Sequence, residues 1–488
     1  MAHTLTAYYY TDPATAVTVD FYGAVSDNDG IAVDSYEMGI PGIEQARNNS
    51  LYSDSSRPVY SRHGTVTDVL TVTVRGSTNT NLYTNLHLLV KLGEYARMAA
   101  ESRNESHPAY MKFKPGGSAA GEVLYAVIYD CRVQLPAGWA NTQDATLTID
   151  DVVVTIERTM WQADAPISYV QGAGGNTANI ALTGQAFASS ASSSANVGGD
   201  TSALRTLTMF HDIGSTTGQI DRVIVGYRSK NRGGSQYAAL GKKESESATM
   251  GTDTSAVADA TASNGNVAQC TFATTTTDAI RISGSGIPWG THRVYMRAKI
   301  TSTAVASVYV KHQSESLANG AVFISGEEVT VSSTSYLVYD MGIVRYFQEG
   351  YGNAYEYTGH TGFYQVFASL ASGSGNLDID WLYFMPTEGF VTAKSLGIGT
   401  SNPTAKNIFL LTNGMWQESA SVFYSGATTT YGSTAKVSYT SSFDPIPGPF
   451  ALYWLVGTDS GSEFDVGIHA SLTVSLATNP RYIMPSEI

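Results

Sequence analysis

Apolar and polar residues alternate along much of this chain, and such alternation predicts β-strands that are buried on one face only. Residues 65–75, Thr-Val-Thr-Asp-Val-Leu-Thr-Val-Thr-Val-Arg, show the pattern most clearly, and residues 149–157 form a valine-rich run. Within the first 165 residues, strands are predicted over 16–22, 59–75, 110–113, 123–135 and 145–159. This part of the chain is therefore expected to contain a β-sandwich.

One segment breaks the alternation and predicts a long helix. Residues 81–103 carry Leu82, Leu86, Leu89, Ala96 and Ala99 at helical spacing, with polar residues between them. Residues 76–80, Gly-Ser-Thr-Asn-Thr, supply capping residues just before this segment. Residues 1–165 thus predict an α+β unit in which one helix flanks the sandwich.

The next segment has the composition of a flexible linker. Residues 166–200 are rich in Gly, Ser, Ala and Asn, so we expect a domain boundary near Pro166. The remainder has β character throughout, with strand-like runs separated by turn residues. These runs are 204–210, 220–227, 293–300, 306–312, 336–344, 363–370, 377–385, 408–411, 451–456 and 468–476.

Residues 238–386 predict a self-contained jelly roll. A β-sandwich whose ends lie close together can be inserted into a loop of another domain. Residues 166–237 and 387–488 would then form one split β-sandwich around the insert. A simple tandem of two sandwiches is the alternative. In either case the predicted fold class is mainly β, with the α+β unit first and β-sandwich or jelly-roll domains after it.

Composition excludes several kinds of partner. The 488 residues carry a net charge of −14, and only 14% are charged, against about 25% in a typical soluble domain. The chain lacks the basic surface that binding to nucleic acid or to an anionic membrane requires. No run approaches about 18 consecutive apolar residues, and the first residues do not form a secretory signal. We therefore predict neither a sequence-specific nucleic-acid partner nor a membrane partner.

The two cysteines suggest no covalent framework. Cys131 and Cys270 lie in strand-like runs of different predicted domains. Two buried free thiols are therefore expected, rather than a disulfide or a cysteine zinc site.

The order of elements in the first 165 residues resembles that of tube-forming and distal tail proteins of long-tailed bacteriophages. Two long strands end in Thr-Val-Thr-Val-Arg-Gly76, and one amphipathic helix follows. A short strand at 109–113 and two long strands ending at Trp161 complete the pattern. The resemblance covers about a third of the chain. It implies a ring-forming assembly domain, expected to be hexameric, with a peripheral β-domain after it.

Residues 238–386 resemble jelly-roll carbohydrate-binding modules that bear a structural calcium. The matching parts are Glu244-Ser-Glu246, residues 262–267, residues 290–297 and residues 378–382. Asp378 and Asp380 share one face of a strand, and carboxylate oxygens are the ligands that calcium prefers. Glu244, Glu246 and Asp380 are therefore candidate calcium ligands. The alternatives are a solvated strand end or an Asp hydrogen-bonded to a loop; no other cofactor is expected.

A tyrosine-rich segment is the candidate contact with a glycan or a protein partner. Tyr351, Tyr355 and Tyr357 lie among Gly, Asn and Thr, and loop tyrosines stack on sugars or serve protein interfaces. No carboxylate pair, Ser-His-Asp set or phosphate-binding loop stands out. We therefore expect a protein that is not an enzyme.

The sequence as a whole predicts a structural virion protein of a tailed phage, at the tail tube or the distal tail and baseplate. It would assemble in the host cytoplasm, pair with itself and with other tail proteins, and present peripheral domains to host-surface glycan. One alternative is a stand-alone glycan-binding β-protein of a cell surface. The other is a polysaccharide depolymerase.

Overall fold

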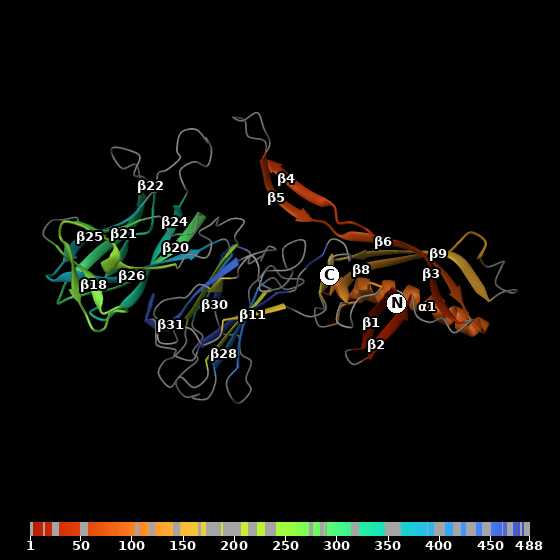
Figure 1. The fold of residues 1–488 in the computed structure, drawn as a ribbon. Helices are drawn as coiled ribbons and strands as arrows, with labels where there is room; N and C mark the ends of the chain where they lie inside the picture. Colours follow the sequence, from red (N-terminus) through yellow and green to blue (C-terminus); the bar gives the residue numbers. More distant parts are fainter. Residues whose placement is uncertain are drawn as a thin grey trace. The chain divides into compact units, whose positions relative to one another are not determined.

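The contacts of the chain divide it into two units (Figure 1). Unit 1 comprises Met1–Ile167, Gly199–Leu204 and Asn479–Ile488, and unit 2 comprises Ser168–Gly198 and Arg205–Thr478. The computed structural model describes residues 3–12, 15–21, 29–48, 57–102, 107–116, 123–139, 147–163, 167–171, 187–188, 206–212, 222–229, 241–272, 277–283, 287, 290–313, 322–346, 363–387, 389–394, 406–412, 421–425, 436–441, 450–460, 462–465, 472–478 and 481–482. Both units are built mainly of antiparallel strands, which confirms the predicted fold class.

Unit 1 is built on a nine-stranded sheet whose main path runs β2-β1-β7-β8-β9-β6-β3. Its strands are β1 (Thr4–Asp12), β2 (Thr15–Asp20), β3 (Gly30–Glu37), β6 (Val66–Arg75), β7 (Tyr110–Lys114), β8 (Leu124–Gln134), β9 (Thr148–Arg158), β10 (Trp161–Ala163) and β34 (Arg481–Tyr482). Buried residues of these strands and of the helix form one core. The alternation at 65–75 predicts this correctly, because Leu70, Val72 and Val74 all belong to that core.

The predicted helix is confirmed as α1 (Asn79–Glu101), which begins two residues earlier than expected. The side chain of Thr78 caps it by accepting a hydrogen bond from the Asn81 amide at 3.2 Å. Leu82, Leu86 and Leu89 are buried against the sheet. Among the described residues, no helix combines the length and the apolar character needed to span a bilayer.

Gly93 allows the helix to approach the sheet closely. A Cβ atom added there would lie 2.1 Å from the backbone oxygen of Cys131 on β8. The helix therefore packs onto β8 through a position that only glycine fits, even though glycine weakens a helix interior. Cys131 is buried and free, as is Cys270 in unit 2, which confirms the sequence prediction.

One predicted strand is two strands in the structure. Residues 59–75 were expected to be continuous, but β5 (Arg57–His63) pairs with β4 (Ile43–Asn48) in a separate two-stranded sheet, while β6 pairs with β3 and β9. The chain changes partner between these strands, where the Gly64 amide donates to the Gly42 oxygen at 2.8 Å. Alternation does not identify a strand's partner, so it could not separate the two.

The C-terminus also differs from the sequence-based division. All of 387–488 was assigned to the split sandwich, but Asn479–Ile488 belongs to unit 1. There β34 pairs with β10 through Trp161–Tyr482 and Gln162–Arg481. The chain leaves unit 1, builds unit 2 and returns to unit 1.

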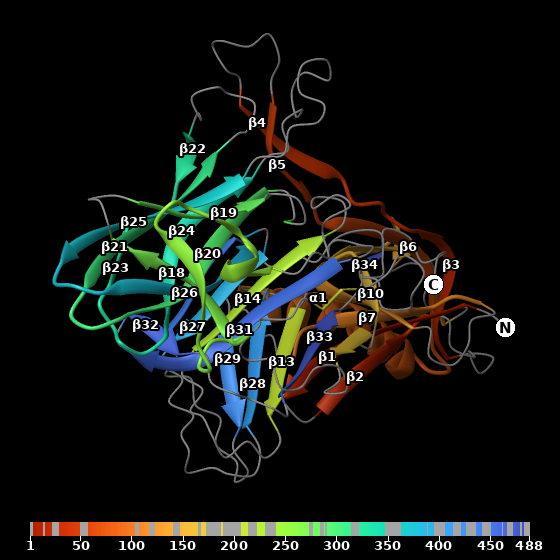
Figure 2. The ribbon, with the colours of Figure 1, turned by 60° about the vertical axis from the view of Figure 1, so that its left-hand side comes forward.

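Unit 2 contains a twelve-stranded, a six-stranded and a five-stranded sheet. Strands from the two flanks of residues 238–386 pair with each other: β13 with β28 and β33, and β14 with β27 and β31 (Figure 2). The flanking strands are β11 (Ile167–Gln171), β12 (Phe187–Ala188), β13 (Thr206–Asp212), β14 (Arg222–Ser229), β27 (Gly389–Lys394), β28 (Lys406–Thr412), β29 (Ser421–Ser425), β30 (Lys436–Ser441), β31 (Phe450–Ser460), β32 (Glu463–Asp465) and β33 (Leu472–Thr478).

The buried residues of the strands between these flanks form one core. These strands belong to the six-stranded sheet and to one part of the twelve-stranded sheet, which continues from β24 through β32 into the flanking strands. They are β15 (Lys242–Glu244), β16 (Thr249–Met250), β17 (Thr254–Ala258), β18 (Asn266–Thr271), β19 (Thr277–Ser283), β20 (Gly290–Ile300), β21 (Val305–Gln313), β22 (Val322–Ser325), β23 (Val329–Val331), β24 (Leu337–Tyr346), β25 (Phe363–Ser372) and β26 (Asn376–Pro386). A short 3-10 turn, Ser245–Ser247, follows β15. We call β15–β26 the inner sandwich.

Candidate functional site

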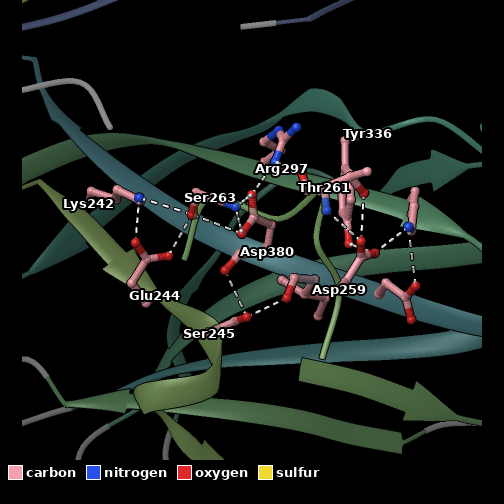
Figure 3. Close-up of polar contacts among 12 residues, drawn as sticks. Lys242, Glu244, Ser245, Asp259, Thr261, Ser263, Arg297, Tyr336 and Asp380 are labelled. Carbon is pink, nitrogen blue, oxygen red and sulfur yellow. Dashed lines mark hydrogen bonds and ion pairs between the residues drawn. The ribbon is translucent and has the colours of Figure 1, made fainter. Parts of the chain in front are cut away.

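The inner sandwich contains a buried ionic cluster centred on Asp380 (Figure 3). Strand β26 lies between β18 and β20, and Asp380 on it has no exposed surface. Its carboxylate forms an ion pair with Arg297 of β20. It also accepts hydrogen bonds from the Ser263 amide at 3.0 Å and from Ser263 Oγ at 2.9 Å. The charge of Asp380 is thus neutralised and its oxygens are hydrogen-bonded, as burial of a carboxylate requires.

The predicted ligand Glu244 joins the same cluster. It forms an ion pair with Lys242 on its own strand. Ser263 Oγ lies 2.9 Å from Glu244 as well as from Asp380, so the two carboxylates share its single hydroxyl proton. Burial raises the pKa of Glu244, while the contacts with Lys242 and Ser263 oppose that rise. The third candidate, Glu246, accepts a hydrogen bond from Asn264 Nδ2 at 2.8 Å. The three predicted residues therefore hold the 259–265 turn against β15 and β26.

A fourth carboxylate, that of Asp259, completes the cluster. Asp259 pairs with Lys299 and accepts hydrogen bonds from the Tyr336 hydroxyl and the Thr261 amide, both at 2.8 Å. Burial raises the pKa of Asp259, but hydrogen bonds from Lys299, Thr261 and Tyr336 outweigh burial and hold that pKa well below its ordinary value. Arg297 and Lys299 each lie 4.4 Å from the centre of the Tyr336 ring. Cations and carboxylates thus alternate through the cluster.

This arrangement does not fit a calcium ion. Calcium takes six to eight oxygen ligands, whereas Glu244 and Asp380 already face Lys242 and Arg297. A bound cation would have to displace both basic side chains. Within the described part of the chain, no group of three or more His, Cys, Asp or Glu is arranged to hold a metal. Calcium binding stays a prediction from the sequence, and the geometry favours an ion-pair network in its place.

Sequence reasoning missed the cations of this cluster, Lys242 and Arg297 among them, and the hydrogen-bonding Ser263. Ser263 and Arg297 lay in segments that carried the resemblance to carbohydrate-binding modules, and Lys242 lay two residues before one of them, but none was assigned a role. A signal was present, because Asp378 and Asp380 interrupt an otherwise apolar run from Leu377 to Met385. Carboxylates in a fully buried strand need a positively charged partner. The other predicted contact residues, Tyr351, Tyr355 and Tyr357, lie outside the described residues.

A hollow of about 310 Å³ lies beside the cluster. It is lined by Lys242, Lys243 and Glu244 of β15, by Ser247, Ala248 and Thr249, and by Arg281, Ile282 and Ser283 of β19. Burial lowers the pKa of Lys243. Basic side chains thus line this hollow in a chain whose overall charge is negative.

In unit 1 the notable surface is the β4–β5 hairpin. It extends away from the nine-stranded sheet as a two-stranded ribbon (Figure 1). At its base, Ile40 and Ile43 are 64% and 62% exposed, the two highest values among the large apolar side chains exposed in the described residues. A two-stranded hairpin alone is marginally stable in water. Ile40 before the hairpin and Ile43 at its first residue therefore form an exposed apolar pair.

Comparison with known proteins gives structural likeness only. No protein-family model matches the sequence, and a search of curated proteins finds no relative. The chain is similar to the Dit protein of phage SPP1, described as a hub adsorption apparatus of phages that infect Gram-positive hosts. That match has 8% identity and a TM-score of 0.23, and covers 79% of this chain and 100% of the other.

Two further matches cover different shares of the chain. A chain of the phage p2 baseplate in its activated conformation with Ca has 9% identity and a TM-score of 0.24, over 78% of this chain and 98% of the other. The CBM22-1 xylan-binding domain of Paenibacillus barcinonensis Xyn10C has 10% identity and a TM-score of 0.20, over 35% of this chain and 98% of the other. Phage hub proteins and carbohydrate-binding modules, the two groups that the sequence resembles, both occur among the structural neighbours. At such TM-scores we argue function from this chain's own geometry.

Proposed function

We propose that this chain is a structural, non-enzymatic virion protein of a tailed phage, a ring-forming component of the tail tube or of the distal tail and baseplate. Unit 1 would form the ring, expected to be a hexamer, and would contact other tail proteins. Unit 2 would be peripheral and would contact host-surface glycan.

The observation that carries the assembly role is the exposed pair Ile40 and Ile43 at the base of the β4–β5 hairpin. Burial of an isoleucine side chain contributes about 1.5–3 kcal/mol, so covering Ile40 and Ile43 is worth several kcal/mol per interface. A second copy is the partner that closes a ring, because one patch meeting a different patch on the next copy repeats around a closed axis. Each copy would then stabilise the hairpin of its neighbour.

Light scattering after size exclusion, with negative-stain electron microscopy, tests this role. The wild-type chain is expected as rings whose mass is six times 51.9 kDa. The double variant Ile40→Ser/Ile43→Ser is expected to dissociate to single chains. Ile343→Ser is the matched control, since Ile343 is 38% exposed but lies in unit 2.

Two results would contradict the assembly role: single chains from the wild type at every concentration, or rings that persist in the double variant. A ring-forming wild type would also exclude the stand-alone glycan-binding alternative. The depolymerase alternative predicts release of reducing ends from host capsule, whereas the structural role predicts none.

A further inference from the structure

A ring that repeats one contact between unlike patches needs two patches on each copy. The pair Ile40 and Ile43 supplies one of them. In the described part of unit 1, the other exposed large apolar side chains are Tyr83, Val90 and Met98, and all three belong to α1. The solvent-facing side of this helix is therefore the candidate for the second patch.

The three exposed apolar residues of α1 share one side of the helix. At 3.6 residues per turn, Tyr83, Val90 and Met98 lie within an arc of about 80° around the helix axis. A surface helix normally places polar residues on the side away from the core. Met98 departs furthest from this rule among the three, since 53% of its surface is exposed. Contact with a neighbour would remove that apolar surface from water.

Met98 borders a hollow of about 320 Å³ at the C-terminal end of α1, here called the helix-end hollow. Its apolar lining comes from Tyr95, Met98 and Ala99 of the helix, from Tyr10 of β1 and from Ala109. This volume is that of a small binding pocket, and the side chains that contribute most to protein interfaces insert into such pockets. The helix-end hollow is therefore suited to apolar side chains of a partner.

The two patches lie at different places in unit 1. Ile40 follows Gly39, whose amide donates a hydrogen bond to Asp68 near the start of β6 at 2.8 Å. Tyr10, which lines the helix-end hollow, lies near the end of β1. Strands β7, β8 and β9 separate β1 from β6 in the sheet. Two unlike and separate patches on one copy are what a repeated head-to-tail contact requires.

The charges of the two patches are complementary. The sequences of β4 and β5 contain three arginines and one glutamate, a net charge of +2 in a chain whose net charge is −14. Among the described residues that line the helix-end hollow, Asp12 is acidic and none is Lys or Arg. The last turn of α1 contains no basic residue, and its carbonyl groups carry a partial negative charge. Such complementarity orients two copies as they meet.

We propose that the helix-end hollow receives the pair Ile40 and Ile43 of the next copy around the ring. The two isoleucines pack against Met98 and Tyr95, and the positively charged hairpin lies along the negative end of the helix. The contact is between two copies of unit 1. It identifies the receiving surface for the assembly role and so rests on the proposed function.

Cross-linking of the assembled full chain tests the contact. The double variant Ile43→Cys/Met98→Cys, treated with a short bismaleimide, is expected to give a ladder of linked chains on a denaturing gel. Cys131 and Cys270 are buried, so the reagent does not reach them. Ile43→Cys/Tyr83→Cys is the matched control, because Tyr83 lies on the same side of α1 but about 22 Å along the axis from Met98. This control and each single variant are expected to give no ladder.

Met98→Lys tests the same contact without cross-linking. A lysine near the C-terminal end of a helix is favourable, so the melting of unit 1 is expected to stay unchanged. A charge buried in the contact is unfavourable, so this variant is expected to give single chains where the wild type gives rings. Met98→Leu is the matched control and is expected to keep the rings, because leucine is apolar and of similar size.

Three results would overturn the contact while rings still form: no ladder from Ile43→Cys/Met98→Cys, a ladder of equal strength from the Tyr83 control, or rings that persist in Met98→Lys. A ladder from Ile43→Cys alone would also overturn it, since like patches would then meet. Single chains from the wild type at every concentration would contradict the assembly role itself. Light scattering of the wild type distinguishes that result from a failure of this contact alone.

Discussion

Asp68 of unit 1 belongs to a fully buried ion pair. Its carboxylate has no exposed surface and forms an ion pair with Arg158, which is 1% exposed. It also accepts hydrogen bonds from the Tyr36 hydroxyl and the Gly39 amide, both at 2.8 Å. Arg158 in turn lies 4.2 Å from the centre of the Trp161 ring. Asp68 therefore ties β6, β9 and the segment after β3 together.

The substitution Asp68→Asn keeps the volume and removes the charge. Breaking a buried ion pair from one side costs about 3–5 kcal/mol, because the other charge stays buried without compensation. The amide oxygen still accepts one hydrogen bond, so the lower value of about 3 kcal/mol is expected. For a unit of this size each kcal/mol lowers Tm by about 2–4 °C, which predicts a fall of about 6–12 °C.

Differential scanning calorimetry of the full chain measures this shift in the transition of unit 1. The matched control is Glu94→Gln on the surface of α1, where Glu94 pairs with Arg97 and both side chains are more than half exposed. That change is expected to cost about 0.5 kcal/mol or less. Equal shifts for the two variants, or a shift below about 2 °C for Asp68→Asn, would refute the argument that burial makes this pair important.

Four further predictions follow from the structure. Gly93→Ala is expected to lower the free energy of unfolding of unit 1, measured in urea, by about 1–3 kcal/mol. The alanine Cβ would collide with the backbone oxygen of Cys131, and this outweighs the higher helix propensity of alanine. A gain in stability would contradict the close packing of α1 on β8. Burial raises the pKa of the Cys131 thiol to about 12 and that of Cys270 to about 11, so a thiol reagent at pH 8 should react with neither until guanidinium unfolds the chain. Folding lowers the pKa of Asp259, so the ionised carboxylate stabilises unit 2 fully above about pH 4, and this stabilisation is lost as the pH falls further. The free energy of unfolding of unit 2 should therefore fall less steeply with decreasing pH in Asp259→Asn than in the wild type. An unchanged pH dependence would contradict the contacts of Asp259 with Lys299 and Tyr336. Chelator or added calcium should leave the melting of unit 2 within about 1 °C, whereas a rise of several degrees with calcium would restore the predicted metal site.

Patterns of neighbouring residues in the sequence were sufficient to predict the helix and the strands whose formation depends on side-chain periodicity and end capping. The alternation at 65–75 predicts β6, and apolar residues at helical spacing behind Thr78 predict α1. Both patterns work because side-chain period and end capping are properties of a few neighbouring residues. Strands β1 and β3 were missed, and β5 was merged with β6, because pairing with a distant partner decides them.

For the candidate site, the sequence identified Glu244, Glu246 and Asp380 as a group but assigned them to a cation from solution. The tertiary structure instead supplies Arg297 from β20 and Lys242 from β15 as the compensating charges. The helix-end hollow beside Met98 was not foreseen, since it depends on how α1 and β1 pack together.

The sequence by itself determined the mainly β class, the one long helix of the described residues and the two buried thiols, because composition and short-range periodicity carry that information. Only the tertiary structure decided which strands pair, that the C-terminal β34 returns to unit 1, and which charges neutralise Asp380 and Asp68. The physical reason is the same in each case: strand partners and buried ion pairs join residues far apart in the chain, and their energies depend on distances and burial that exist only after folding.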